Sequence, residues 1–158
     1  MLLLYNHVAT PMEQNLKLTS KEGKSFEDPT KYRKFVGSLI YFSITRPGIT
    51  FVVGILSRFM HHPCEGHWVA AKRALKYLKG TQTYGIKYSK VLDFHLVVYS
   101  DSDFDGDKEN GVSTSGYSMN LGSATISWRS CKKSVPTDST TEAEYVVAAQ
   151  ATKEIIWL

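Results

Sequence analysis

Residues 94–103 have the sequence FHLVVYSDSD, a nearly continuous apolar and β-branched run that ends in aspartates. A run of this kind is typical of a central strand that is covered on both faces. An acidic, glycine-containing turn follows it, from Asp101 to Gly111. Asp101 therefore closes the most hydrophobic predicted strand, and we expect its carboxylate at the edge of a core rather than out in solvent.

The chain beyond this strand predicts two more strands and a helix. Residues 115–121 and 124–128 favour a hairpin around Gly122-Ser123. Ser139-Thr140-Thr141-Glu142 fits a capping box, which predicts a helix over residues 139–158. Steps of three and four residues back from Ile155 reach Ala151, Ala148 and Glu144. The helix should therefore carry Glu144 on the small apolar face that lies on the sheet.

Before residue 84 the apolar spacing is helical. A first helix should begin at Asp28-Pro29-Thr30 and break at Arg46-Pro47-Gly48, and a second apolar run spans residues 51–60. A third helix is expected from Glu65 to Gly80, with Gly80 as the glycine just past its end. We predict an α/β (α+β) fold with three parts: an extended lead-in (1–30), a small helical bundle (31–84) and a β-β-β-α unit (85–158).

Composition narrows the class of protein. The chain has 158 residues, 42% hydrophobic and 22% charged, which is ordinary for a globular protein. No apolar run reaches the length of a membrane span, and no signal peptide is recognisable. Its two cysteines have no metal-binding spacing, which favours free thiols. We expect an intracellular protein, cytoplasmic or nuclear, without a membrane partner.

Charge divides the chain into a basic and an acidic half. Residues 1–90 hold 14 Lys/Arg against 5 Asp/Glu, and residues 91–158 hold 5 against 10. Four basic residues on the third predicted helix are candidates for binding a phosphate backbone, namely Lys72, Arg73, Lys76 and Lys79. The alternative is that these side chains only solvate a surface helix.

The acidic half suggests metal chemistry. Asp101 at a strand end and Glu144 on a sheet-facing helix could converge on a divalent cation such as Mg²⁺, which accepts one or two carboxylates together with water and substrate phosphate. Two such ions can cleave a phosphodiester. Asp103, Asp105, Asp107 and Glu109 most simply form a solvated acidic turn. A calcium loop is disfavoured because Val112 stands where a bidentate glutamate is needed.

Sequence blocks along nearly the whole chain resemble one protein family. They are residues 10–18, 32–41, 45–47, 56–60, 67–68, 71–81, 99–103, 113–117, 126–128 and 139–145. In this order they resemble the Pol polyprotein of copia-type LTR retrotransposons, from the end of reverse transcriptase into the first half of the RNase H domain. The chain departs from the family pattern at Gly48, where aspartate is usual, and at Phe104, where tryptophan is usual.

The resemblance implies a function and its residues. Asp101 and Glu144 would be the first two of four carboxylates that bind Mg²⁺ (or Mn²⁺) and cleave the RNA strand of an RNA–DNA hybrid. Asp103 belongs to the same block as a further metal candidate. The other two carboxylates and the remaining Pol domains are expected in a full-length relative, so little turnover is expected of this chain. The alternatives are a nucleic-acid-binding remnant that uses the basic helical half, and an inert fragment.

Overall fold

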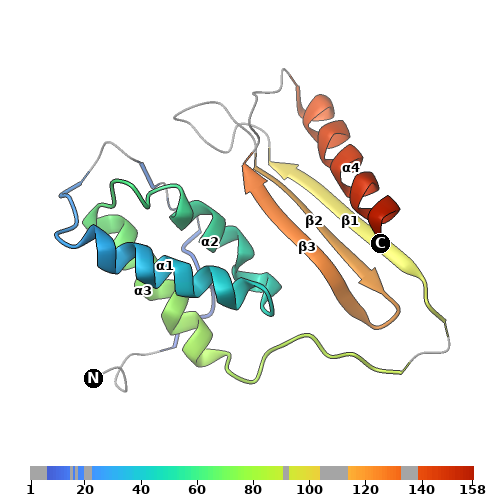
Figure 1. Cartoon of the computed structure of the whole chain (residues 1–158), viewed down its shortest axis with the longest axis horizontal. Coiled ribbons are helices and arrows are strands. Elements are labelled where there is room, and N and C mark those ends of the chain that lie inside the picture. Colours follow the sequence, from blue (N-terminus) through green and yellow to red (C-terminus); the bar gives the residue numbers. More distant parts are fainter. Residues whose placement is uncertain are drawn as a thin grey trace. The chain divides into compact units, whose positions relative to one another are not determined.

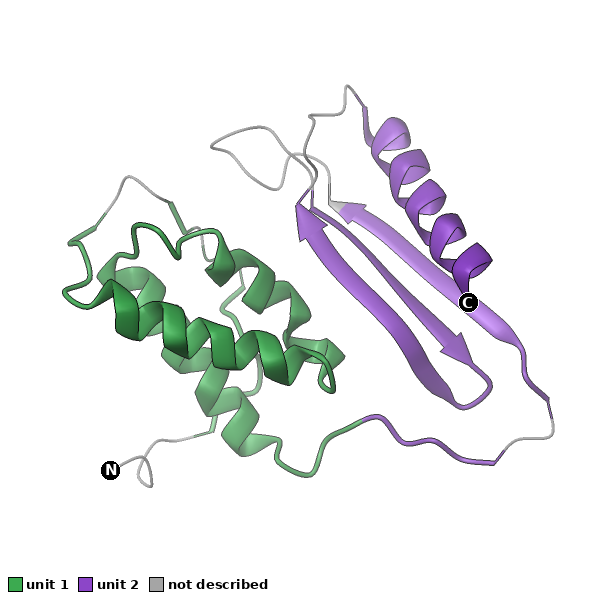
Figure 2. Cartoon of the chain, in the orientation of Figure 1, with its two compact units in different colours: residues 1–85 green, residues 86–158 purple. Residues whose placement is uncertain are grey.

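The structure is a computed structural model that describes residues 7–14, 16, 18–19, 23–90, 93–103, 114–132 and 139–158. In these residues it has four α-helices, one short 3-10 helix and three strands, which confirms the predicted mixed α/β class. The chain divides into two compact units, Met1–Gly85 and Ile86–Leu158, each with its own core (Figure 2). No helix in the described part of the chain is long and apolar enough to span a membrane.

Unit 1 is helical, and local sequence signals set the limits of its helices (Figure 1). Its elements are α1 (Pro29–Ser43), the 3-10 helix η1 (Pro47–Ile49), α2 (Thr50–Ser57) and α3 (Glu65–Gly80). Before α1, the Asp28 side chain accepts a hydrogen bond from the Lys31 amide at 2.9 Å, the cap that an Asp-Pro pair predicts. The apolar run over residues 51–60 extends beyond the second helix, which ends at Ser57.

The core of unit 1 lies where its helices meet. Its buried residues are Tyr32, Val36, Leu39, Ile49, Val52, Val53, Leu56, Ala70, Ala71, Ala74 and Leu78. The alanines all come from α3, and such small side chains let neighbouring helices approach closely. Met12, Leu16, Leu18 and Phe26 of the N-terminal segment pack against this core. The lead-in therefore shares the core of the helices.

Arg46 holds the C-terminal end of α3. Its Nη1 donates to the carbonyl oxygen of Thr81 at 2.7 Å, and its Nη2 donates to that of Gln82 at 3.1 Å. Carbonyl groups at the end of a helix lack intrahelical partners and carry partial negative charge, so a cation is favourable there. The sequence Arg46-Pro47-Gly48 thus does more than break a helix, because it also joins η1 to the end of α3.

We expect Arg46→Ala to lower the unfolding free energy of unit 1 by about 2 kcal/mol, because two charge-assisted hydrogen bonds are removed. Arg46→Lys should restore only part of this, since an ammonium group lacks the planar fork of guanidinium. Amide hydrogen exchange of α3 measures the change. The matched control is Arg33→Ala, because Arg33 is exposed and bonds to Thr30 within α1. Equal losses in the two alanine variants would contradict a stabilising role for Arg46.

In its described residues, unit 2 is a three-stranded antiparallel sheet with one helix. Strands β1 (Leu96–Asp103), β2 (Thr114–Leu121) and β3 (Ala124–Lys132) lie in the order β1-β2-β3, and α4 (Thr140–Trp157) packs along β1 (Figure 1). The predicted hairpin joins β2 to β3, and Gly122 in its turn has φ 58°, a left-handed conformation that suits glycine. Before α4, the Ser139 hydroxyl accepts from the Glu142 amide at 3.1 Å, as the predicted cap requires.

The sheet has one face that meets α4 and one that does not. The face toward α4 is built from Val98, Tyr117, Met119 and Ile126, which pack with Ala151 of the helix. Side chains alternate along a strand, so Val97 and Tyr99 lie on the other face, where they are 42% and 61% exposed. The prediction of a central strand covered on both faces is therefore wrong for the described residues, in which β1 pairs with β2 alone. An apolar, β-branched composition identifies a strand but not the number of its neighbours.

Candidate functional site

The C-terminal end of β1 and the first turns of α4 lie at the same end of unit 2, because the helix runs antiparallel to the strand (Figure 1). Asp101 belongs to the last part of β1, and Glu144 lies near the start of α4. The fold therefore carries both predicted metal-binding carboxylates to one end of this unit.

Asp101 lies on the face of the sheet that α4 leaves uncovered. Its neighbour Ser102 is buried on the other face, where its hydroxyl lies 3.4 Å from that of Ser115. Asp101 itself is exposed, and its Oδ1 accepts the amide hydrogen of Ser102 at 2.9 Å. Its partner in β2 is Gly116, which has no side chain. Asp101 is thus a solvent-exposed carboxylate rather than one at the edge of a core, contrary to the sequence-based expectation.

The predicted orientation of α4 is also wrong. The helix buries Ala143, Val147 and Ala151, which are spaced by four residues, whereas Ala148 and Glu144 are exposed. Steps of three or four residues back from Ala151 lead either to Ala148 and Glu144 or to Val147 and Ala143. In the structure the second set packs against the sheet. Successive residues of a helix are about 100° apart, so Glu144 flanks the buried face beside Ala143.

The described carboxylates are the kind of group that a magnesium ion prefers, but they do not gather into a cluster of three or more in the described part of the chain. Asp103 ends β1 opposite Thr114, while Asp105, Asp107 and Glu109 lie outside the described residues. In the described part of the chain, no group of three or more His, Cys, Asp or Glu side chains could hold a metal ion. Asp101 and Glu144 are exposed carboxylates, the type of group that Mg²⁺ combines with water and substrate phosphate.

The basic residues predicted on α3 have unequal surroundings. Lys72 is exposed, whereas Lys76 and Lys79 are half-buried. Arg73 holds the lead-in: its Nη1 lies 3.0 Å from Glu13 Oε1, and its Nη2 donates to the Thr10 hydroxyl at 3.2 Å. The four side chains therefore do not act as one uniform basic face, since the guanidinium is engaged within the protein.

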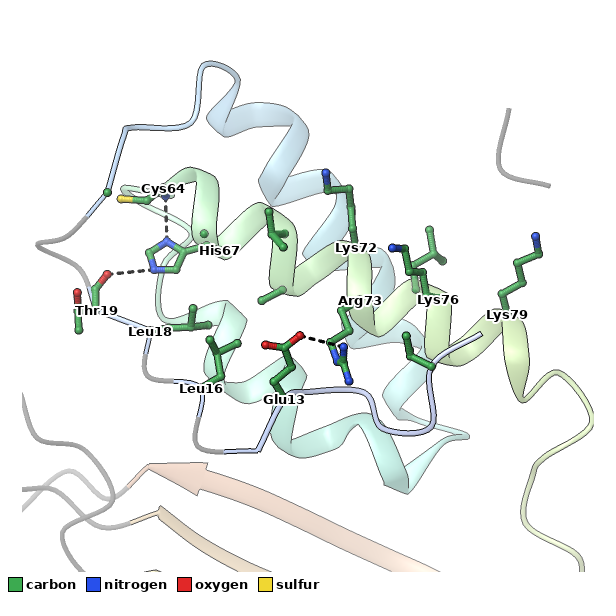
Figure 3. A pocket seen from close by; sticks show the side chains of 16 residues that line it. Glu13, Leu16, Leu18, Thr19, Cys64, His67, Lys72, Arg73, Lys76 and Lys79 are labelled. Atoms are coloured by element: carbon green, nitrogen blue, oxygen red, sulfur yellow. Dashed lines mark hydrogen bonds and ion pairs between the residues drawn. The ribbon is translucent and has the colours of Figure 1, made fainter. Parts of the chain in front are cut away.

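A groove of about 600 Å³ lies between the lead-in and α3 (Figure 3). All four predicted phosphate-binding residues line it, and the three lysines follow one another along α3. The apolar part of its lining includes Leu16, Leu18, Val69 and Leu75. The groove thus combines apolar walls with cationic side chains, so its chemistry is amphipathic rather than purely that of a phosphate site.

His67 lies in one of the family-like blocks (67–68), but no role was predicted for it, and the structure makes it a central structural residue. It is 2% exposed and stacks on Phe59, with ring centroids 3.8 Å apart. Its Nδ1 accepts the Cys64 amide hydrogen at 2.9 Å, so its Nε2 carries the proton and donates to the Thr19 carbonyl at 3.1 Å (Figure 3). The imidazole therefore caps α3 and attaches the lead-in to it. A side chain able to accept at the third helical position was the only sequence signal.

A second groove, of about 470 Å³, lies beside Trp68. Lys31 and Lys34 of α1 line it, and neither was among the predicted nucleic-acid-binding residues. Their spacing of three residues places them on one side of a helix, which is a sequence signal. That this side of α1 lies next to Trp68 of α3 depends on tertiary packing.

Two tyrosines in the cores have raised pKa values. Burial alone raises the pKa of the Tyr32 phenol far above its usual range, and its hydroxyl donates to the Leu56 carbonyl at 2.9 Å. Burial, and then the nearby Glu154 carboxylate, raise the pKa of Tyr117. Glu154 in turn accepts a hydrogen bond from the Ser127 hydroxyl at 3.2 Å, which links α4 to β3. These groups contribute to stability and lie apart from the candidate carboxylates in the sequence.

Comparison with known proteins finds several plant Pol polyproteins that match nearly the whole chain. The chain is 46% identical over 151 residues to the Retrovirus-related Pol polyprotein from transposon RE2 of Arabidopsis thaliana, covering 96% of this chain and 10% of that protein. It is 39% identical over 158 residues to the corresponding polyprotein from transposon TNT 1-94 of Nicotiana tabacum, covering 96% of this chain and 12% of that protein.

A shorter relative matches along most of its own length. The Secreted RxLR effector protein 161 of Plasmopara viticola is 44% identical over 128 residues, which cover 80% of this chain and 90% of that protein. This chain spans only about a tenth of the length of the Pol relatives. No family model and no solved structure matches it.

Proposed function

Because this chain belongs to the retrovirus-related Pol polyproteins of copia-type transposons, we propose that its unit 2 is part of an RNase H-type nuclease that cleaves the RNA strand of RNA–DNA hybrids. The observation that supports this most is the placement of two exposed carboxylates, Asp101 and Glu144, at one end of unit 2. The strand end and the helix start place two residues that are 43 positions apart in the chain at the same end of unit 2, with Asp101 on the face of the sheet that α4 leaves uncovered.

Each of the two residues has a role in this proposal. Divalent metal ions, when bound, supply activation of the attacking water and stabilisation of the leaving oxygen. Asp101 is oriented by the hydrogen bond from the Ser102 amide to its Oδ1, and the absence of a side chain at Gly116 leaves room beside it. Glu144 provides a second exposed carboxylate from α4. Two carboxylates are few for two cations, so slow turnover is expected from this chain.

The test is cleavage of a labelled RNA–DNA hybrid in Mg²⁺ or Mn²⁺ at high protein concentration. We expect slow cleavage that falls at least about 100-fold in both Asp101→Asn and Glu144→Gln, because each removes a charged oxygen ligand without changing the size of the side chain. Asp93→Asn is the matched control, since Asp93 is an exposed carboxylate of the same unit, paired with His95 at 3.2 Å. Cleavage that survives in both site variants would sink the assignment.

A second candidate function is nucleic-acid binding without cleavage. The observation that favours it is the basic balance of residues 1–90, which hold 14 Lys/Arg against 5 Asp/Glu. Binding of this kind weakens steeply with salt, because counterions are released when lysine neutralises phosphate. Salt-sensitive binding that Asp101→Asn leaves unchanged, in a folded chain that does not cleave, would favour this candidate over the nuclease.

A further inference from the structure

The groove beside Trp68 is lined by residues of unit 1, and its make-up points to a ligand. Lys31, Lys34 and Phe35 of α1 line one side, and Trp68 of α3 lines the other. Its volume of about 470 Å³ falls within the range of roughly 300–1,000 Å³ that is usual for ligand sites.

Trp68 is held in place by two other aromatic rings. Phe26 stacks on it with ring centroids 4.9 Å apart and an interplanar angle of 27°. Phe35 meets it nearly edge-on, at 5.0 Å and 69°. Both arrangements are favourable for aromatic pairs. The indole is half-buried and fixed, and because Phe26 stacks on one of its faces, the opposite face is the one that can receive another planar group.

Cations surround this ring. The ammonium groups of Lys31 and Lys72 lie 5.6 Å and 6.0 Å from the Trp68 ring centroid, within the range of cation–π attraction. Lys31, Lys34 and Lys72 are all exposed, so their long side chains can move toward an anion. The carboxylate in the groove, Asp28, already accepts the Lys31 amide as the cap of α1. The groove is therefore aromatic and net cationic.

We propose that this groove binds an unpaired nucleotide of a single-stranded nucleic acid, with its base against Trp68 and the adjoining phosphates on Lys31, Lys34 and Lys72. A fixed aromatic ring beside cations is how proteins hold single strands, since every base has a stacking face and every nucleotide a phosphate. A base within a duplex is not free to stack on a side chain. The inference rests on the proposed nucleic-acid role of the chain and assigns the single-stranded part of the ligand to unit 1.

The test is binding of a labelled oligothymidylate to the full chain without divalent metal. The variant Lys31→Gln/Lys34→Gln/Lys72→Gln is expected to bind at least about 30-fold more weakly, and its salt dependence should fall by roughly 2 in slope, at about 0.7 for each phosphate that lysine no longer neutralises. The matched control is Lys87→Gln/Lys90→Gln/Lys153→Gln, which removes the same charge from exposed lysines of unit 2. In a chain with Trp128→Phe and Trp157→Phe, oligothymidylate should also quench the fluorescence of Trp68.

Several results would overturn the proposal. If the two triple variants bind equally weakly, the effect comes from overall charge and not from the groove. If oligothymidylate binds without changing the fluorescence of Trp68, no base stacks on this ring. Displacement by polyglutamate as effective as by oligothymidylate would identify an acidic peptide as the occupant. Binding is measured without metal and is therefore independent of cleavage. If the chain binds oligothymidylate in the groove but never cleaves a hybrid, the binding proposal holds and the nuclease proposal fails. If the chain cleaves the hybrid but both triple variants bind oligothymidylate equally well, the nuclease proposal holds and the groove proposal fails.

Discussion

Replacing His67 with alanine is expected to lower the unfolding free energy of unit 1 by about 3 kcal/mol. The substitution opens a cavity against Phe59, leaves the Cys64 amide without its acceptor and frees the Thr19 carbonyl. It should also release the lead-in from α3, so that limited proteolysis cuts the N-terminal segment first. Urea unfolding followed by the fluorescence of Trp68, with the other two tryptophans replaced by phenylalanine, measures the loss.

Two further variants separate the roles of His67. His67→Gln should regain about 1 kcal/mol, because a glutamine at the third helical position can reach back to the Cys64 amide. His62→Ala is the control for loss of an imidazole, since His62 is exposed. If His67→Ala proves no more harmful than His62→Ala, then the imidazole does not join the lead-in to α3 in solution.

Unit 1 is expected to lose stability steeply above about pH 10, the pKa of an unperturbed tyrosine. Tyr32 is 0% exposed, and burial raises its folded pKa well above that of the unfolded chain. The folded state therefore keeps the phenolic proton at pH values where the unfolded state releases it. The contribution of Tyr32 is complete below the unfolded pKa and is lost as pH rises toward the folded pKa, by about 1.4 kcal/mol per pH unit.

Tyr32→Phe tests this pH dependence directly. At neutral pH it should cost about 1 kcal/mol, because the hydrogen bond to the Leu56 carbonyl is removed. Above pH 10 or so it should flatten the loss of stability, because the ionising group is gone. Tyr41→Phe is the control, since Tyr41 is 76% exposed. Parallel pH profiles for Tyr32→Phe and the unmodified chain would contradict the role of Tyr32.

The limits of the helices could be predicted because the signals that set them are local. Asp28-Pro29 starts α1 through a cap within four residues, and Pro47 begins η1 where the first helix must break. Gly80 was predicted for the wrong reason: it is the last residue of α3, and its φ is not positive. A Cβ there would lie 3.1 Å from the ring of His7, so a larger residue requires this exposed side chain of the lead-in to shift, a contact that is invisible in the sequence.

The placement of the candidate site was harder to predict, because it depends on which faces meet. Periodicity allowed two faces of α4, and only packing on the sheet distinguishes the face with Val147 from the face with Glu144. The apolar residues around Val98 predicted a strand correctly, yet Asp101 proved exposed because α4 covers one face of β1. Likewise, Lys31 approaches Trp68 only because α1 packs on α3.

The attachment of the lead-in to α3 has a consequence for synthesis on the ribosome. The hydrogen bond between Thr19 and His67 joins residues 48 positions apart, and that between Thr10 and Arg73 joins residues 63 apart. At about 5–20 residues per second, Thr19 is synthesised roughly 2–10 s before its partner His67. Until α3 has been synthesised, Leu16 and Leu18 lack part of the core that they pack against, so these apolar side chains are less covered during that interval than in the folded chain.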